Sequence, residues 1–441
     1  MATDTAPSTS TGSALRGRDF RLLWAGQSIS KTGSAVTTFA LPLVAVRTLG
    51  ADTLMMGVLN AMLWLPWLVV GLHAGAWADR RGKRSLMTGC QLASAVLIVS
   101  IPVLAWLHVL TMWYVLVIAF ATGCSTVLFT ASYNAFLPLL VDKNELLAAN
   151  TRMTGSEQAA NIAGPGIGAL ITQFSSAVLG LVVDAASFVV CAACLWSIRT
   201  REPSDRPGGQ PGQPGQPGDP GRPEQPQQPR SSLRADIRAG ISFVARDPYL
   251  RVLTANSACA NLFLSGIQAL VVVFLIRGDG LSPWAVGATT ITISVGGLLG
   301  ASLAPRISRH LGSARTMLTV TVADCFLLLF PLAGRDALLV LALAGTLVWA
   351  TGTVVGNVVS GSFRQVYCPP GMRGRIAMTS RFISFGIWPV GSLLGGVLGT
   401  VFDVRTALFI LAGGNAVSGI WLFIGPLKRS RDLPSEPAAS P

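Results

Sequence analysis

The sequence predicts an all-α membrane protein with twelve transmembrane helices, arranged as two six-helix halves. Hydrophobic residues make up 51% of the 441 residues and charged residues only 12%, which is about half the charged share of an ordinary soluble domain. Twelve continuous apolar segments come close to the roughly 20 residues that a membrane-spanning helix needs. Lys and Arg gather in alternate connections between these segments.

The apolar segments are continuous rather than alternating, which favours helices over a β-barrel. Six spans precede a polar break, and the sequence predicts them at 22–46, 54–77, 85–107, 112–131, 154–174 and 177–198. Six more follow it, at 252–276, 283–304, 316–333, 337–360, 377–402 and 407–425. No cleavable signal peptide is expected, because the first apolar run is too long for one.

The polar break at 201–231 is rich in Pro, Gly and Gln and is predicted to be a disordered linker. It separates a first half at 16–200 from a second half at 232–426. The tails at 1–15 and 427–441 are expected to be cytoplasmic, the first of them disordered. The second half begins with a short helix that has Leu233, Ile237, Ile241 and Val244 on one face. This helix is expected either on the membrane surface or packed against the cytoplasmic side of the bundle.

The positions of Lys and Arg predict the orientation of the chain. Odd-numbered connections contain only Arg47, Arg277, Arg335 and Arg405, and Lys31 lies within the first span. All other basic residues lie in the tails, the even-numbered connections or the helix ends beside them. The positive-inside rule therefore places both termini and the linker in the cytoplasm. This distribution explains the net charge of +13, so no nucleic-acid partner is expected.

The two halves carry traces of an internal repeat. Residues 245–251, Ala-Arg-Asp-Pro-Tyr-Leu-Arg, resemble residues 17–23, Gly-Arg-Asp-Phe-Arg-Leu-Leu, and each segment precedes the first span of its half. A shift of 227 residues also superposes small residues of the fifth spans: Gly164 on Gly391, Gly168 on Gly395 and Ala169 on Gly396.

The connection between the second and third spans reads Gly75-Ala-Trp-Ala-Asp79-Arg80-Arg81-Gly82-Lys83-Arg84. Gly82 permits a tight turn, and the basic cluster suits the anionic cytoplasmic leaflet. The spacing resembles the G-x-x-x-D-R-x-G-R/K-R/K signature of the major facilitator superfamily, whose two halves are parallel repeats. The resemblance implies a gating motif at Gly75, Asp79, Arg80, Gly82, Lys83 and Arg84, in which Asp79 helps to lock the cytoplasmic gate. The second half keeps a partial copy, Gly300 to Gly312, that has no acid in place of Asp79.

The fifth span contains Gly164-Pro165-Gly166-Ile167-Gly168-Ala169. Pro165 permits a bend, and the glycines permit close approach of a partner helix. The segment resembles the end of the antiporter motif G-P-x-x-G-G of exporters. Thr151, Ala160 and Ala169 replace glycines of that motif, and helix packing alone is the alternative explanation.

Three further segments narrow the resemblance: Asp184-Ala-Ala-Ser187-Phe188, Arg373-Gly374-Arg375 and the Arg-Asp-Phe opening. They resemble an exporter group that includes macrolide efflux pumps and the enterobactin exporter. The resemblance implies export of a small organic compound, such as an antibiotic or other natural product, across the cell membrane by proton antiport. Siderophore export and nutrient import by the same fold are the alternatives.

Ionisable residues within spans are costly and are functional candidates. Asp184, Glu157 and Asp324 are predicted as proton-coupling candidates, because a carboxyl in a partly wet apolar cavity can load and release a proton near neutral pH. Lys31 is a counter-ion or a substrate contact. Local pairing is the alternative for each. The fourth span has no Arg, although many drug:proton antiporters of the superfamily use one there.

The family geometry implies a central cavity whose wall suits a bulky amphiphilic molecule. The predicted cavity residues are Gln27, Lys31, Phe39, Trp64, Asn256, Gln268, Asn357 and Trp388. Helix packing and interfacial belts are the alternative role for any one of them.

An enzyme or a scaffold is less well supported by the sequence. The three His are far apart and no H-E-x-x-H occurs, so neither a metal site nor another cofactor is expected. No G-x-x-x-x-G-K-[ST] occurs either, which argues against ATP hydrolysis. Cys191-x-x-Cys194 is interpreted as two small apolar residues of one helix.

Overall fold

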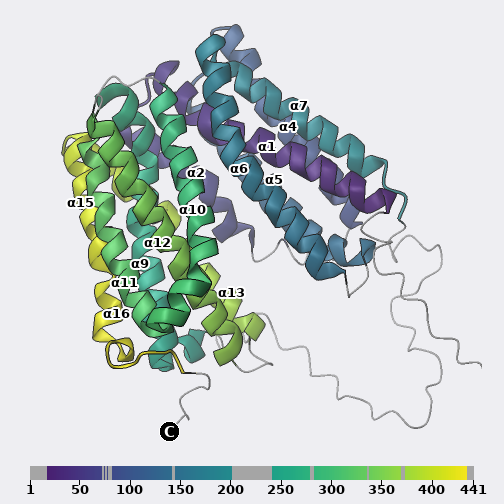
Figure 1. The fold of residues 1–441 in the computed structure, drawn as a ribbon. Coiled ribbons are helices and arrows are strands. Elements are labelled where there is room, and N and C mark those ends of the chain that lie inside the picture. Colours follow the sequence, from purple (N-terminus) through teal and green to yellow (C-terminus); the bar gives the residue numbers. More distant parts are fainter. Residues whose placement is uncertain are drawn as a thin grey trace, which may run out of the picture.

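The computed structural model describes residues 17–71, 74, 77, 82–141, 145–200, 241–278, 283–334, 337–368 and 373–434. Every regular element within these residues is a helix. The predicted linker, the first tail and most of the connection between the second and third spans lie outside the described residues, as does the end of the C-terminal tail. Figure 1 shows the helices as two bundles that are joined at one end.

Each predicted span corresponds to one helix or to two consecutive helices. In the first half these are α1 (Arg18–Arg47), α2 (Thr53–Val69), α4 (Lys83–Trp106), α5 (Met112–Leu140), α6 (Leu146–Phe174) and α7 (Ala177–Trp196). In the second half they are α9 (Pro248–Val273) with η2 (Phe274–Gly278), α10 (Pro283–Leu311), α11 (Ser313–Cys325) with η3 (Phe326–Leu332), α12 (Ala337–Tyr367), α13 (Arg373–Gly386) with α14 (Trp388–Val401), and α15 (Val404–Ser418) with α16 (Ile420–Ile424).

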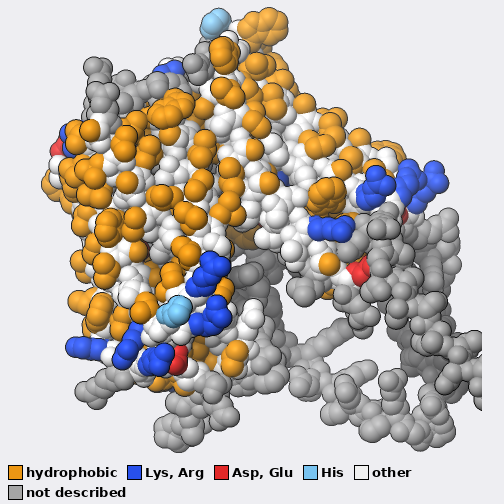
Figure 2. Space-filling view, in the orientation of Figure 1, with side chains coloured by type: hydrophobic (Ala, Val, Ile, Leu, Met, Phe, Trp, Pro, Cys, Tyr) orange, Lys and Arg blue, Asp and Glu red, His pale blue; other side chains and the backbone are white. Residues whose placement is uncertain are grey.

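Ten of these segments are long and apolar enough to cross a membrane. The other two miss this criterion for separate reasons. The described part of α2 is apolar but has 17 residues, and α6 has 29 residues but is polar over its first half. Together the twelve segments confirm the predicted membrane fold. Figure 2 shows hydrophobic side chains over the flanks of both halves, as expected for surfaces that face lipid.

The molecule has two distinct ends. We call the end at which α1 begins and α16 finishes the terminal end, and the opposite end the far end. In Figure 1 the two halves meet at the far end, at the top of the view, and separate toward the terminal end. Lys and Arg side chains gather at the terminal ends of both halves in Figure 2.

The glycines of the internal repeat make equivalent contacts in the two halves. Gly164 of α6 packs against Ala35 of α1, and Gly168 packs against Phe39. In the second half Gly391 of α14 packs against Leu262 of α9, and Gly395 packs against Gly266. The same 227-residue shift relates both members of each contact, since it carries 35 to 262 and 39 to 266. The repeat is therefore a repeat of helix-to-helix contacts.

Small residues also join the halves to each other near the far end. A Cβ atom on Gly57 of α2 would lie 2.9 Å from the Cα of Gly396 on α14. A Cβ atom on Gly287 of α10 would lie 3.1 Å from the Cβ of Ala169 on α6. Asn60 of α2 adds two hydrogen bonds, donating to the Ser392 hydroxyl at 2.9 Å and to the Ser265 carbonyl at 3.2 Å. Backbones this close leave no channel at these two seams.

The repeated Arg-Asp segments anchor the first helix of each half at the terminal end. Asp19 accepts hydrogen bonds from the backbone N–H groups of Arg199 and Thr200, at 3.1 and 2.8 Å. Asp247 caps α9 by accepting from the N–H groups of Tyr249 and Leu250, and its second oxygen accepts from the Tyr367 hydroxyl at 2.6 Å. Asp19 and Asp247 are thus equivalent in the repeat but form hydrogen bonds with different neighbours.

Segments at both borders of the predicted second half pack onto it. Residues 241–246 of the predicted short helix are helical, and Val244 is buried among α9, α12 and α16 side chains. After α16, the Asp432 carboxylate accepts from the Ser313 N–H at 2.8 Å, and Leu433 packs against the same cluster. The described part of the short helix therefore packs against the bundle.

A single added carbon tests the close α9–α14 contact. A Cβ atom on Gly395 would lie 2.5 Å from both the Cα and the carbonyl oxygen of Gly266, so Gly395→Ala forces two backbones apart. We expect it to destabilise the protein by about 1–3 kcal/mol, measured as a lower thermal unfolding temperature in detergent. Gly413→Ala is the matched control, because a Cβ at Gly413 meets no atom within 4 Å. Equal effects of the two variants would contradict the packing assignment.

Candidate functional site: an ion pair and a polar cavity between the halves

Lys31 of α1 and Glu157 of α6 form an ion pair. The Lys31 Nζ and Glu157 Oε1 atoms lie 2.8 Å apart, and each side chain is 44% exposed. Both residues stand near the middle of long helices. The carboxylate also lies within electrostatic range of the Tyr133 side chain on α5. The sequence singled out Lys31 and Glu157 separately, and the fold brings them together.

The partial exposure of these two charges indicates what kind of space lies beside them. A charge in the middle of a bilayer is costly unless it faces water or buried polar groups. The exposed sides of Lys31 and Glu157 must therefore border a water-filled space and not lipid.

The polar first half of α6 leads to the same conclusion. A cavity of about 580 Å³ lies between α6 and α10 and is lined on the α6 side by Asn150, Thr151, Thr154 and Gln158. Leu298 of α10 forms part of the opposite wall. Near this cavity the Ser294 hydroxyl of α10 lies 3.3 Å from the Asn161 carbonyl of α6. This face explains why α6 is less apolar than the other long helices.

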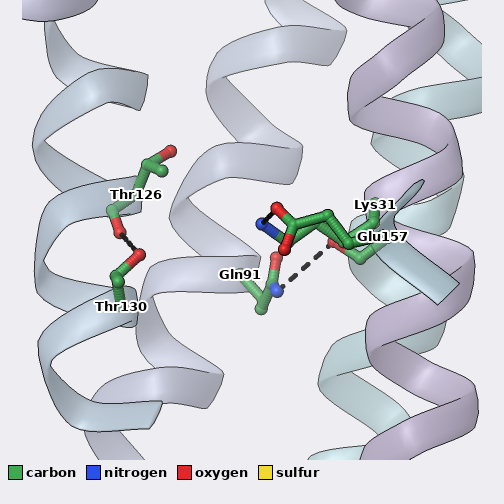
Figure 3. Close-up of polar contacts among 6 residues, drawn as sticks. Lys31, Gln91, Thr126, Thr130 and Glu157 are labelled. Carbon is green, nitrogen blue, oxygen red and sulfur yellow. Dashed lines mark hydrogen bonds and ion pairs between the residues drawn. The ribbon is translucent and has the colours of Figure 1, made fainter. Parts of the chain in front are cut away.

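Figure 3 shows the ion pair and the neighbouring polar side chains. The Lys31 and Glu157 side chains lie alongside each other, and Thr126 and Thr130 project from the neighbouring helix α5. Each threonine hydroxyl donates to a carbonyl of its own helix, at 2.9 Å and 2.8 Å. Their oxygens keep an acceptor lone pair for a ligand.

Asp184 lies elsewhere, inside the first half. It is 1% exposed and lies in the contact between α7 and α1, where a Cβ atom on Gly33 would be 2.6 Å from its Oδ1 atom. The Ser187 hydroxyl lies 3.1 Å from Oδ1 and donates to the Asp184 carbonyl at 2.7 Å. In this conformation the Asp184 carboxyl is closed off from the cavity.

The described part of the predicted gating motif holds two helices together. Gly75, Asp79 and Arg80 lie outside the described residues, whereas Gly82 is the N-cap of α4 and Lys83 begins the helix. The Arg84 guanidinium donates to the Ile198 carbonyl at 2.5 Å and to the Trp196 carbonyl at 3.1 Å. A cation suits the end of α7, where helix carbonyls lack partners. The gating role of the motif stays a prediction.

The antiporter-like motif forms a seam of three helices. Helix α6 continues through Pro165, Gly164 and Gly168 pack on α1, and Ala169 packs on Gly287 of α10. The packing role of these residues is visible in the structure, and their role in export stays a prediction.

The predicted cavity residues divide by location. Trp64 of α2 and Trp388 of α14 meet between the halves, with ring centroids 4.2 Å apart, and Phe385 stacks on Trp64 at 5.9 Å. Gln268 and Asn357 are exposed on α9 and α12. Trp388 is buried, whereas Trp64, Gln268 and Asn357 keep exposed surface that a substrate can contact.

Three other predicted cavity residues face neighbouring helices. Phe39 is buried against Gly168. Asn256 of α9 is half-buried, and its Oδ1 atom is enclosed without a hydrogen-bond partner among the described residues. Gln27 is buried and donates to the Cys191 Sγ atom of α7 at 3.3 Å. Gln91 of α4 donates to the same sulfur, a contact that sequence reasoning missed because it joins three separate spans.

Sequence comparison places this geometry in a known family. A family model described as "Major Facilitator Superfamily" matches residues 23–388. The chain belongs to this superfamily of membrane transporters.

Two relatives and two solved structures extend the comparison. The chain is 25% identical to the multidrug efflux pump Tap of Mycolicibacterium fortuitum, over 92% of this chain and 95% of the relative. It is 24% identical to macrolide efflux protein A of Streptococcus pyogenes, over 42% of this chain and 46% of the relative. The fold resembles the nucleoside transporter NupG with a TM-score of 0.72, at 15% identity over 92% of this chain and 99% of that one. It also resembles a bacterial homologue of ferroportin in an inward-facing state, with a TM-score of 0.70, at 15% identity over 92% and 98% of the two chains.

Reversing the two charges tests the ion pair. Lys31→Glu places two acids side by side and Glu157→Lys places two cations side by side, so each variant should unfold at a lower temperature in detergent. The double variant restores an opposite-charge pair and should recover most of the loss. The coupling energy should be about 1 kcal/mol, because water in the cavity screens half-exposed charges. A double variant as unstable as the sum of the single variants would contradict the pairing.

Proposed function

We propose that the protein is a secondary active transporter that exports a small organic compound across the cytoplasmic membrane, driven by proton antiport. One observation carries the proposal. A half-exposed ion pair lies near the middle of α1 and α6, and the first half contacts the second through close small-residue packing near the far end. Such a site can open alternately to either side when the halves rock about it. The relatives named as multidrug and macrolide efflux proteins support export of a drug or natural product.

The orientation follows from charge. Lys and Arg gather at the terminal end (Figure 2), and the positive-inside rule assigns that end to the cytoplasm. The linker and both termini then lie in the cytoplasm, and the closed far end faces outward. The structure corresponds to a cytoplasm-open state in which the cavity receives its substrate. The likeness to the inward-facing ferroportin homologue supports this assignment.

The ion pair supplies a simple means of coupling. A proton that reaches Glu157 neutralises the carboxylate and leaves Lys31 without its counter-ion at the contact between α1 and α6. The protonated site then differs from the paired site in charge and hydrogen bonding, and each can favour a different state of the two halves. Asp184, enclosed between α1 and α7, is the second candidate for the coupling proton.

The cavity wall indicates the chemistry of the cargo. The α6 side presents amides and hydroxyls, the ion pair presents both signs of charge, and Trp64 stands at the α2–α14 seam. A bulky amphiphilic molecule with a polar or charged group would be held by such a wall. The aromatic rings would contact its apolar part.

Transport in inside-out membrane vesicles tests direction and coupling together. With the vesicle lumen acidified, a macrolide or another amphiphilic drug should accumulate inside, and collapsing the gradient should stop accumulation. Glu157→Gln should abolish the response to the gradient, because an amide cannot carry the proton. Asp184→Asn distinguishes the two candidates, since unaltered proton-driven export would remove Asp184.

The matched control is Gln158→Asn, which shortens a neighbouring cavity side chain without touching a titratable group. It should alter the concentration dependence of transport and leave the dependence on the gradient unchanged. No movement of any tested drug, together with no effect of the gradient, would contradict proton-driven export. Drug movement in the opposite direction would favour the importer alternative.

A further inference from the structure

The two halves have buried polar side chains at equivalent places between helices. Long amide side chains fill this place in the first half only. In the first half Gln27 of α1 and Gln91 of α4 both donate to the Cys191 Sγ atom of α7, each at 3.3 Å. Both amides are 5% exposed. Two long side chains thus occupy the space between three helices.

The second half has short side chains at the equivalent positions. The 227-residue shift carries Gln27 to Thr254 and Cys191 to Ser418. Aligning Gly82 with Gly312, the glycines that precede α4 and α11, carries Gln91 to Thr321. The buried hydroxyls of Thr254 and Thr321 have no hydrogen-bond partner among the described residues. A hydroxyl enclosed without a partner is destabilising unless something else satisfies it.

A carboxylate and an amide adjoin Thr321. Thr321 contacts the α15–α16 junction, where a Cβ atom on Gly419 would lie 2.6 Å from its Oγ1 atom. Helices α11 and α15 run in opposite directions, so Asp324, one turn after Thr321, and Asn415, one turn before Gly419, occupy the next layer of the bundle. Asn415 is 2% exposed, and its Nδ2 atom has no partner within the described chain. This Nδ2 group can donate only to an acceptor such as a carboxylate, so the amide oxygen is the atom that can bind a cation.

The Asp324 carboxylate has no counter-ion in the described helices around it. Helix α9 carries no charge after Arg251, α12 none before Arg364, and α15 and α16 none after Arg405. The cations of α10 and of η4 (Pro426–Arg429) lie at the terminal end, where α11 begins. On α11 itself the only other charge is Arg315, at the opposite end of the helix. A half-buried carboxylate within a span needs a positive partner or a proton.

We propose that Thr321, Asp324 and Asn415 form a binding site for a monovalent cation, either sodium or a proton. Hydroxyl, carboxylate and amide oxygens are the ligands that hard cations prefer. A sodium ion would bind to these oxygens directly. A proton would reside on Asp324, with the neighbouring Thr321 hydroxyl satisfied through water. The site rests on the proposed function, to which it adds a coupling-ion position in the second half, separate from Lys31 and Glu157.

Thermal unfolding of the purified full-length protein in detergent tests the sodium form. Replacing choline chloride by sodium chloride at constant ionic strength should raise the unfolding temperature of the wild type. Asp324→Asn should abolish the rise. Thr321→Val, which has the same shape, should raise the sodium concentration at half-maximal effect about tenfold or more. Thr319→Val is the matched control and should respond like the wild type, because the Thr319 hydroxyl already donates to the Thr316 carbonyl.

Infrared difference spectroscopy tests the proton form on the same samples. A protonated carboxyl band that titrates with pH, disappears in Asp324→Asn and shifts in Thr321→Val supports a proton at this site. If sodium has no effect and no such band occurs, the site is overturned. The site would also be overturned if Thr321→Val unfolded at a higher temperature than the wild type with unchanged cation dependence. That result would mean that the Thr321 hydroxyl binds no ligand.

Neither measurement uses a transport substrate. A protein that fails both tests and still exports drugs against a proton gradient overturns this site and leaves the proposed function standing. A protein that binds the cation and moves no drug contradicts the proposed function and leaves the site standing.

Discussion

The arrangement of this protein depends on one constraint, which is that a charged pair cannot face hydrocarbon in the middle of a bilayer. Lys31 and Glu157 are half-exposed at mid-helix, so the space beside them must hold water. That requirement accounts for the polar face of α6, for the separation of the halves toward the terminal end, and for their close glycine contacts near the far end. Small residues let the halves pack closely near the far end, and the Lys31–Glu157 ion pair requires water at the centre.

The pseudo-symmetry of the halves distinguishes residues that maintain the fold from residues that can differ in function. Equivalent glycines make equivalent contacts, Gly164 with Ala35 and Gly391 with Leu262, so the repeat preserves backbone packing. The side chains have diverged between those contacts. An ion pair lies in the first half at Lys31 and Glu157. The second half has the short hydroxyls of Thr254 and Thr321 at positions that amides fill in the first, and an unpaired acid one turn after Thr321. The two halves therefore share their backbone packing and differ in their polar side chains.

The sequence predicted most of the fold, because bilayer-length apolar runs and the placement of Lys and Arg are local signals that need no tertiary information. It also marked Lys31, Glu157, Asp184 and Asp324 as costly residues. It could not pair Lys31 with Glu157, since the two are 126 positions apart and only the packing of α1 on α6 joins them. For the same reason it assigned Gln27 to the cavity wall, although Gln27 lies against Cys191. Which face of a helix meets which neighbour is decided by tertiary contacts.

Water access at the level of the ion pair tests the central claim most directly. A nitroxide spin label at Gln158, in a variant without native cysteines, should collide more readily with a water-soluble paramagnetic complex than with oxygen. A label at Val189, on the exposed face of α7, should show the reverse preference, because it faces lipid. A label at Gln158 that behaves like the one at Val189 would contradict a water-filled cavity between the halves.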